Sequence, residues 1–330
     1  MGRGRATGES RNSLAENLVA RRLGCVTWAG WWGSVSFARD IKDMSPRWVR
    51  SSADFLTREY GLLTSGQRTP PDFVIIGTKR GGTTSLFNYL VQHPGVIRMF
   101  PGSRDLKSTD FFFRRGQSEA WYRSHFPRRS DRLRRADELG YAPVCGEASP
   151  YYCWDPRVAG FARELAPDVK AILLVRNPVK RAWSHFQERV QNGVEPMNFE
   201  DALHMEDERL AGELEKMLED PTYYSSTYDW YSYRSRGEYL PQIENWLAHF
   251  PREQLLILRS EDLYRETQTT FDRVCGFLGL PTVAMPTQQT FNATWRTSEA
   301  PPASARDALQ AYFLDHNARL EAFLGTPLDW

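Results

Sequence analysis

The sequence has little of what marks several protein classes. It holds 4 cysteines in 330 residues, Cys25, Cys145, Cys153 and Cys275, and none of them lies in a CxxC pair. So few thiols argue against a disulfide scaffold or a thiolate metal site, and they predict buried free thiols in a reducing compartment. The net charge is also small, since the sequence has 42 Lys and Arg and 41 Asp and Glu. This balance argues against a protein held to nucleic acid by bulk charge.

Long apolar runs are missing as well. The most apolar stretch near the N-terminus, Leu23 to Ala38, is interrupted by glycine, serine and threonine. This stretch is shorter than a membrane-spanning helix, which needs about 20 apolar residues. It also begins after Arg21 and Arg22, too far along the chain for a good signal peptide. We therefore expect a cytoplasmic protein with no firm membrane span, and membrane association through residues 23–38 is the alternative.

The pattern of the chain changes near residue 67. Residues 1–66 show scattered Arg, Ser and Gly with little periodicity, which predicts an N-terminal tail with a short helix or two. From 67 to 330, apolar strands alternate with helices, which predicts one α/β domain. The predicted strands are 73–76, 96–100, 142–145, 169–175 and 255–258. The predicted helices are 85–91, 157–165, one that starts at Asn177 and Pro178, 239–250, 267–278 and 304–323. We expect a P-loop-like, three-layer fold with a central parallel sheet flanked by helices.

A glycine-rich segment, Gly77 to Ser85, connects the first predicted strand to the first predicted helix. Glycines let the backbone approach an anion closely, and the amides of a helix N-terminus point toward it. An ATP or GTP loop would place lysine where Thr83 stands, which disfavours a nucleotide hydrolase. A glycine-rich turn with nothing bound is the alternative. The residues that suit an anion are Lys79, Arg80, Gly81, Gly82, Thr83, Thr84 and Ser85.

A second candidate segment follows the strand 169–175. This strand delivers Arg176 to the carboxyl edge of the sheet, where ligands of α/β proteins bind. Ser184 lies about two helical turns further on. A guanidinium and a hydroxyl so placed can share one phosphate. The alternative is a capped helix start without a ligand.

Taken together, the two segments resemble the motifs of a known family. PDFVIIGTKRGGTTSL and LLVRNPVKRAWSHF resemble the 5′-phosphosulfate and 3′-phosphate motifs of sulfotransferases that use PAPS (3′-phosphoadenosine 5′-phosphosulfate). The likeness is greatest to the heparan-sulfate, or carbohydrate, type and its bacterial relatives, and it covers roughly residues 70–330. It continues in WYRSHFP (121–127), GEASP (146–150), RGEY (236–239) and FLGLP (277–281).

This resemblance implies an activity and a donor site. The activity is transfer of a sulfuryl group from PAPS to a hydroxyl or amine of a carbohydrate or other small acceptor, by in-line displacement, without a metal and with PAP as product. It implies Arg80, or Lys79 beside it, as the cation on the leaving phosphate. The resemblance also implies these donor-binding residues: Lys79, Arg80, Gly81, Gly82, Thr83, Thr84, Ser85, Arg176 and Ser184.

The acceptor must lose a proton, and here the sequence departs from its relatives. Relatives carry a glutamate in a Lys-Glu-x-His-Phe-Phe segment. In the matching run, residues 107–112, Ser108 takes the glutamate position and Asp110 the histidine position. We predict Asp110 as the general base and Glu147 as the second candidate. A cap or a structural ion pair is the alternative for each.

Two other functions stay open. One is a non-catalytic protein on the same fold that binds PAP, another nucleotide or a glycan. The other is a nucleotide-dependent kinase, which Thr83 and Arg176 disfavour because a kinase would need a lysine and an acid there. Relatives of the Golgi carry a membrane anchor and often a disulfide, so the resemblance points to a cytoplasmic, bacterial-type member. The acceptor and the oligomeric state do not follow from the sequence.

Overall fold

The computed structural model describes residues 47–114, 116–285 and 300–330. The chain divides into two units between Leu56 and Thr57, inside helix α3 (Arg47–Leu63). All contacts given below lie within the unit that begins at Thr57. The apolar stretch 23–38 and Cys25 lie outside the described residues, and the domain boundary at residue 67 stays a prediction.

The described residues form one sheet of parallel strands in the order β2-β1-β3-β4. In register, Phe73 of β1 lies opposite Gly146 of β2 on one side and Lys170 of β3 on the other. Nearly every strand residue is buried, as is typical of a parallel sheet covered on both faces. The strands are β1 Phe73–Gly77, β2 Gly146–Ala148, β3 Lys170–Val175 and β4 Leu255–Arg259.

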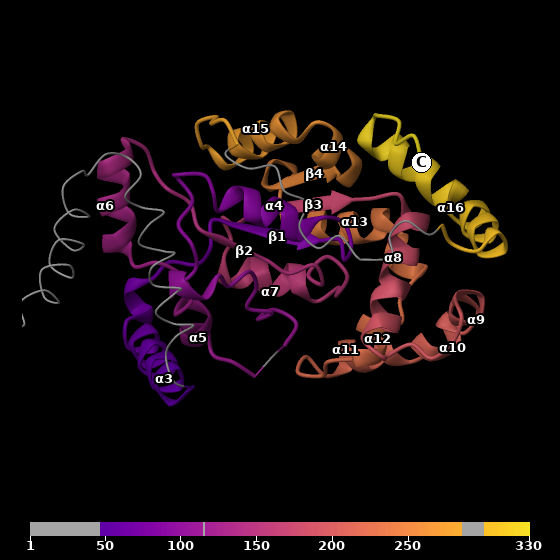
Figure 1. The fold of residues 1–330 in the computed structure, drawn as a ribbon, viewed down its shortest axis with the longest axis horizontal. Helices are drawn as coiled ribbons and strands as arrows, with labels where there is room; N and C mark the ends of the chain where they lie inside the picture. Colours follow the sequence, from indigo (N-terminus) through magenta and orange to yellow (C-terminus); the bar gives the residue numbers. More distant parts are fainter. Residues whose placement is uncertain (1–46, 115, 286–299) are drawn as a thin grey trace, which may run out of the picture. The chain divides into compact units, whose positions relative to one another are not determined.

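Helices pack on both faces of this sheet and extend from its ends (Figure 1). After α3 they are α4 Thr83–Leu90, α5 Glu119–Arg123, α6 Arg129–Leu139, α7 Val158–Leu165, α8 Pro178–Gln191, α9 Phe199–His204, α10 Glu206–Leu210, α11 Glu213–Glu219, α12 Ser226–Trp230, α13 Tyr239–His249, α14 Ser260–Arg265, α15 Thr267–Leu278 and α16 Ala303–Leu324. Short 3-10 turns are η1 Ser65–Gln67, η2 Gly102–Arg104, η3 Ser235–Gly237 and η4 Arg252–Gln254. Over the described ranges, no helix has the length and apolar character needed to cross a membrane.

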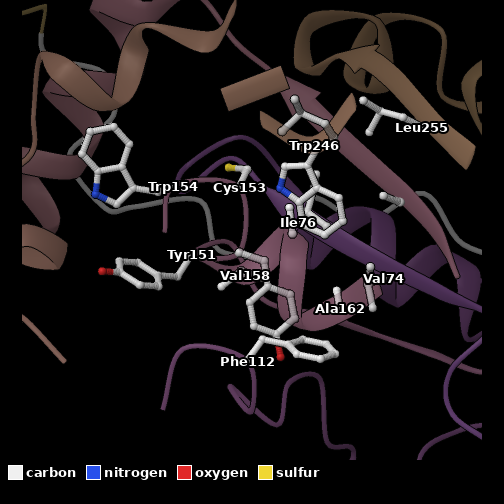
Figure 2. Close-up of a cluster of buried hydrophobic side chains, with 14 of the residues drawn as sticks. Val74, Ile76, Phe112, Tyr151, Cys153, Trp154, Val158, Ala162, Trp246 and Leu255 are labelled. Atoms are coloured by element: carbon white, nitrogen blue, oxygen red, sulfur yellow. The ribbon is translucent and has the colours of Figure 1, made fainter. Parts of the chain in front are cut away.

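Each face of the sheet has its own hydrophobic core. Val74 and Ile76 join α7 and α13 in one core, where Trp246 is among the largest fully buried side chains (Figure 2). Phe73 and Ile75 join α4 and α15 in the other core. Successive strand residues point to opposite faces, so β1 supplies both cores. The predicted three-layer fold with a central parallel sheet is confirmed.

Helix ends follow the local signals in the sequence. The Asn177 side chain accepts the backbone N–H of Lys180 at 3.0 Å and so caps α8, with Pro178 in the first turn. Helix α15 stops at Gly279, which has a φ of 77°. The start of α8 and the end of α15 were predicted at these residues, and both are confirmed.

The predicted strand 96–100 is wrong. Only Val96 forms an isolated bridge, with Val144. Further along, the N–H of Phe100 donates to the backbone carbonyl of His125 at 2.7 Å. The backbone N–H of Phe100 therefore bonds a loop rather than a neighbouring strand. The apolar composition of residues 96–100 did not indicate this contact.

The predicted strand 142–145 is displaced. The chain enters the sheet at Gly146, where β2 begins. Just before it, the backbone N–H of Cys145 donates to the Asp72 carboxylate at 2.6 Å. This side-chain bond replaces a ladder bond, so regular pairing starts one residue later than the predicted strand ends.

The predicted free thiols are confirmed for the cysteines that the structure describes. Cys145, Cys153 and Cys275 are buried and form no disulfide. Burial raises the pKa of each thiol to about 12. These groups therefore act as small apolar side chains of the cores.

His125 is a buried histidine held in its neutral form. It is 6% exposed. Arg58 Nη1 lies 2.8 Å from its Nε2, and its Nδ1 lies 2.8 Å from the carbonyl oxygen of Trp121. A guanidinium only donates, so Nε2 accepts and Nδ1 carries the proton. Burial, with the positive charge of Arg58, lowers the pKa of His125 to about 4.

We expect His125 to weaken the fold as the pH falls from 6.5 to 4. In this window the unfolded chain binds a proton at His125 and the folded chain does not, so the unfolded state gains about 3 kcal/mol. Urea denaturation of the wild type and of His125→Gln at a series of pH values measures the effect. The free energy of unfolding of the variant should fall less steeply in this window, and equal slopes would contradict the prediction.

Candidate functional site

The two predicted segments meet at the carboxyl ends of neighbouring strands. β1 ends at Gly77 and leads through a loop into α4, while β3 leads through Arg176 into α8 (Figure 1). Arg176 Nη1 donates to the backbone carbonyl of Arg80 at 2.7 Å. Arg80 Nε in turn donates to Ser184 Oγ at 3.0 Å. Segments recognised separately in the sequence therefore form one site.

The loop between β1 and α4 is too tight for a side chain at one glycine. A Cβ on Gly81 would lie 2.9 Å from the carbonyl oxygen of Leu174 and 2.9 Å from that of Thr78. Arg80 has a φ of 67° and Gly82 a φ of 92°, both in the left-handed region. The Gly82 cap supplies no side-chain hydrogen bond to α4. The positive end of the α4 helix dipole therefore lies directly at this loop, where it favours a bound anion.

Lys107 is a site residue that was not predicted. Its Nζ donates to Thr84 Oγ1 at 2.9 Å and to Thr83 Oγ1 at 3.2 Å, so it covers the N-terminus of α4. Burial lowers its pKa to about 8, against the opposing charges of Asp110 and Glu188. Lys107 begins the segment in which Asp110 was predicted, but nothing in its spacing linked it to the glycine loop.

Lys79, the residue before Arg80, extends its amine to α12. Its Nζ lies 3.4 Å from Asp229 Oδ1. Burial lowers the pKa of Lys79 to about 8, and the Asp229 charge opposes this. Asp229 also accepts from Tyr224 at 2.8 Å and from Arg236 at 3.1 Å. Lys79 thus belongs to a charge network beside the loop, whereas Arg80 turns to Ser184.

Ser85 faces another direction again. Its hydroxyl is buried and lies 3.3 Å from the hydroxyl of Tyr264, on α14. Thr83 and Thr84 face Lys107 instead. The predicted loop hydroxyls therefore have different partners, Tyr264 for Ser85 and Lys107 for the two threonines.

Asp110 lies in the same segment as Lys107 and is partly exposed. Its Oδ1 accepts hydrogen bonds from the hydroxyls of Ser108 at 2.6 Å and Ser149 at 2.9 Å. Its φ is 56°. The carboxylate that was predicted to take a proton is therefore brought to the site, with one oxygen already bonded to two hydroxyls.

Glu147 is fully enclosed. It is 0% exposed, and burial raises the pKa of its carboxyl. Thr109 donates its backbone N–H at 2.6 Å and its hydroxyl at 2.7 Å, and the hydroxyls of Tyr122 and Tyr152 donate at 2.8 and 2.9 Å. With these bonds, Glu147 holds segment 107–112 against β2. Its place in the structure is that of a positioning residue.

Buried positive charge is the common property of the site. Burial lowers the pKa of Lys79, Lys107 and Arg80, and the neighbouring charge of Arg176 lowers that of Arg80 further. Cations removed from water in this way are stabilised by a nearby anion, which restores their charged form. Together with the positive end of the α4 helix dipole, the group suits an anion with more than one charged end.

The glycine loop allows a direct test. Gly81→Ala should lower the free energy of unfolding by about 2 kcal/mol, because its Cβ meets backbone atoms that cannot move aside cheaply. Gly66→Ala is the matched control, since a Cβ there meets nothing within 4 Å. Urea denaturation of both variants measures the difference. A Gly81→Ala protein as stable as Gly66→Ala would contradict the described loop.

Comparison with known proteins gives consistent matches. The family model described as a sulfotransferase domain matches residues 159–304, which include Arg176 and Ser184 but not the glycine loop. Human heparan sulfate glucosamine 3-O-sulfotransferase 3A1 is 28% identical over 71% of this chain and 50% of its own length. A bifunctional heparan sulfate N-deacetylase/N-sulfotransferase 1 of Caenorhabditis elegans is 26% identical over 74% of this chain and 26% of its own length. This chain thus spans about half of the length of the first relative and about a quarter of the length of the second.

A solved structure matches a larger share of the chain. The crystal structure of a sulfotransferase from Alicyclobacillus acidocaldarius is 28% identical, with a TM-score of 0.58. The match covers 79% of this chain and 98% of that one. The likeness therefore includes nearly all of the bacterial protein.

Proposed function

Because this chain belongs to the sulfotransferase family, we propose that it transfers a sulfuryl group from PAPS to a hydroxyl or amine of a carbohydrate and releases PAP. The observation that carries the proposal is the set of cations around the α4 N-terminus. Arg80 bonds Ser184 on one side of the loop, and Lys107 bonds Thr83 and Thr84 on the other. Such a set supports a ligand with separate anionic groups.

PAPS has a phosphate at its 3′ position and a phosphosulfate at its 5′ position, and it supplies the sulfuryl group. We assign Arg176 and Ser184 to the 3′-phosphate. We assign Arg80 and Lys107 to the 5′ end, where negative charge grows on the phosphate oxygen during transfer. The other residues proposed around the 5′ end are Lys79, Gly81, Gly82, Thr83, Thr84 and Ser85.

The residues present fit this donor. Burial, only partly offset by neighbouring carboxylates, lowers the pKa values of Lys79 and Lys107 to about 8, so their charged forms are destabilised. Phosphate and sulfate oxygens next to these amines would raise both pKa values again and so gain binding energy from the charged form. The tight backbone at Gly81 and the helix N-terminus that follows Gly82 support the same assignment.

The proposal for the acceptor rests on the names of the relatives and on the carboxylates near the site. The names of the curated relatives point to heparan sulfate, a glycan, so we propose a carbohydrate acceptor. Asp110 is a candidate for the acceptor proton, and Glu188 on α8 is another carboxylate beside the site cations. Glu147 we assign to holding segment 107–112. The cytoplasmic location stays a prediction, because the stretch 23–38 lies outside the described residues.

Transfer can be tested with labelled donor. Purified protein is incubated with PAPS carrying radioactive sulfur and a panel of unsulfated heparosan oligosaccharides, chitosan oligosaccharides and a simple phenol. We expect label on at least one carbohydrate and an equal amount of PAP. Micromolar or tighter binding of PAP in calorimetry, with no label on any acceptor, would overturn the proposal in favour of a non-catalytic PAP-binding protein.

Lys107 provides a residue-level test. Lys107→Ala should weaken PAP binding by about 10-fold to 100-fold, the value of one charge-assisted contact. It should also lower kcat by about 100-fold, because a cation at the developing charge is lost. Lys180→Ala, which removes an exposed lysine on α8, is the control and should change neither quantity. Unchanged PAP affinity in Lys107→Ala would remove this residue from the donor site.

A further inference from the structure

Glu188 is a carboxylate of the site with no role assigned so far. It lies four residues after Ser184 on α8, so both side chains project from the same face of the helix. Its Oε1 lies 3.9 Å from Arg80 Nη1, and its Oε2 lies 4.0 Å from Lys79 Nζ. One carboxylate therefore faces both cations of the glycine loop.

The influence of Glu188 also reaches the segment on the other side of the α4 N-terminus. Its negative charge raises the pKa of Lys107 against the effect of burial, as Asp110 does. On α8 itself, Arg189 Nη2 lies 3.3 Å from Glu188 Oε2. Glu188 is thus placed among cations from three separate parts of the chain.

One oxygen of Glu188 has unused capacity to accept a hydrogen bond. Oε2 is buried and accepts no hydrogen bond, although the side chain as a whole is 27% exposed. Asp110 also has a hydrogen-bonded oxygen, since its Oδ1 accepts from two hydroxyls. A buried carboxylate oxygen without a donor is costly, and a hydroxyl or amine of an acceptor would supply the missing donor.

We propose that Glu188 takes the proton of the acceptor, a role that rests on the proposed sulfuryl transfer. The acceptor oxygen forms a bond to sulfur while its proton passes to the Glu188 carboxylate. The bond between sulfur and the bridging phosphate oxygen breaks, and its electron pair leaves with PAP. Glu188, now a carboxylic acid, returns the proton to water.

The position of Glu188 next to Arg80 adds a second consequence. A carboxylate 3.9 Å from Arg80 and the anionic donor compete for the same guanidinium. Removing the charge of Glu188 without changing its shape should therefore strengthen donor binding. The same change removes the proton acceptor and should slow transfer. Effects of opposite sign on binding and turnover distinguish this role from a merely structural one.

Glu188→Gln is the deciding variant, measured with PAP in calorimetry and with labelled PAPS plus the oligosaccharide that the wild type sulfates. We expect PAP to bind about 2-fold to 10-fold more tightly and kcat to fall by about 100-fold or more. Glu188→Asp should recover part of kcat, because it restores a carboxylate. Glu164→Gln, which changes an exposed carboxylate on α7, is the matched control.

Three results would overturn the assignment. A kcat of Glu188→Gln within about 3-fold of the wild type would do so, and Asp110→Asn measured in parallel would then show whether Asp110 takes the proton. Weaker PAP binding together with slower transfer would reduce Glu188 to a structural residue. If the wild type labels no acceptor, the proposed function itself fails and this role with it, a result distinct from a fully active Glu188→Gln.

Discussion

The hydrogen bond from Arg176 to the backbone carbonyl of Arg80 joins two loops that leave the sheet at neighbouring strand ends. Arg80 can present that carbonyl because its backbone is left-handed, and this turns its side chain toward Ser184. Tyr239 fixes the other partner by donating to the carbonyl of Arg176 at 2.7 Å. The relative position of both proposed phosphate sites therefore depends on backbone contacts, and the charges only act on a geometry already set.

Desolvation of the site lysines determines how strongly this geometry binds an anion. Lysines at positions 79 and 107 are held mainly out of water, and their pKa values of about 8 measure the cost. An exposed lysine would bind phosphate weakly, because water screens the attraction. A buried lysine gains more from a polyanionic ligand, since the ligand stabilises a charge that water no longer solvates. The same burial that weakens the cations therefore favours an anion with several charges over a small one.

The sequence predicted the central sheet well, because its longer strands and the start of α8 rest on local signals. Apolar runs mark β1 and β3, and the Asn177 cap marks α8. The strand predicted at 96–100 does not form, because the backbone N–H of Phe100 bonds a loop carbonyl instead of a strand. The helices from α9 to α12 were not predicted, because they are too short to give a periodic pattern of apolar residues. Lys107 was missed because it meets Thr83 across 24 positions of sequence, which no spacing rule connects.

The carboxylates near the site show why residue type alone could not assign their roles. Glu147 has four donors and no exposure, so it fixes a segment in place. Asp110 has one oxygen shared by two serine hydroxyls. Glu188 has cations at 3.3 to 4.0 Å and an oxygen without a hydrogen bond. A proton acceptor needs a free lone pair directed at the substrate and a counter-charge that keeps it ionised. Glu188 combines nearby counter-charges with an oxygen that accepts no hydrogen bond, and for this reason the proposed base lies on α8, beside the cations of the glycine loop.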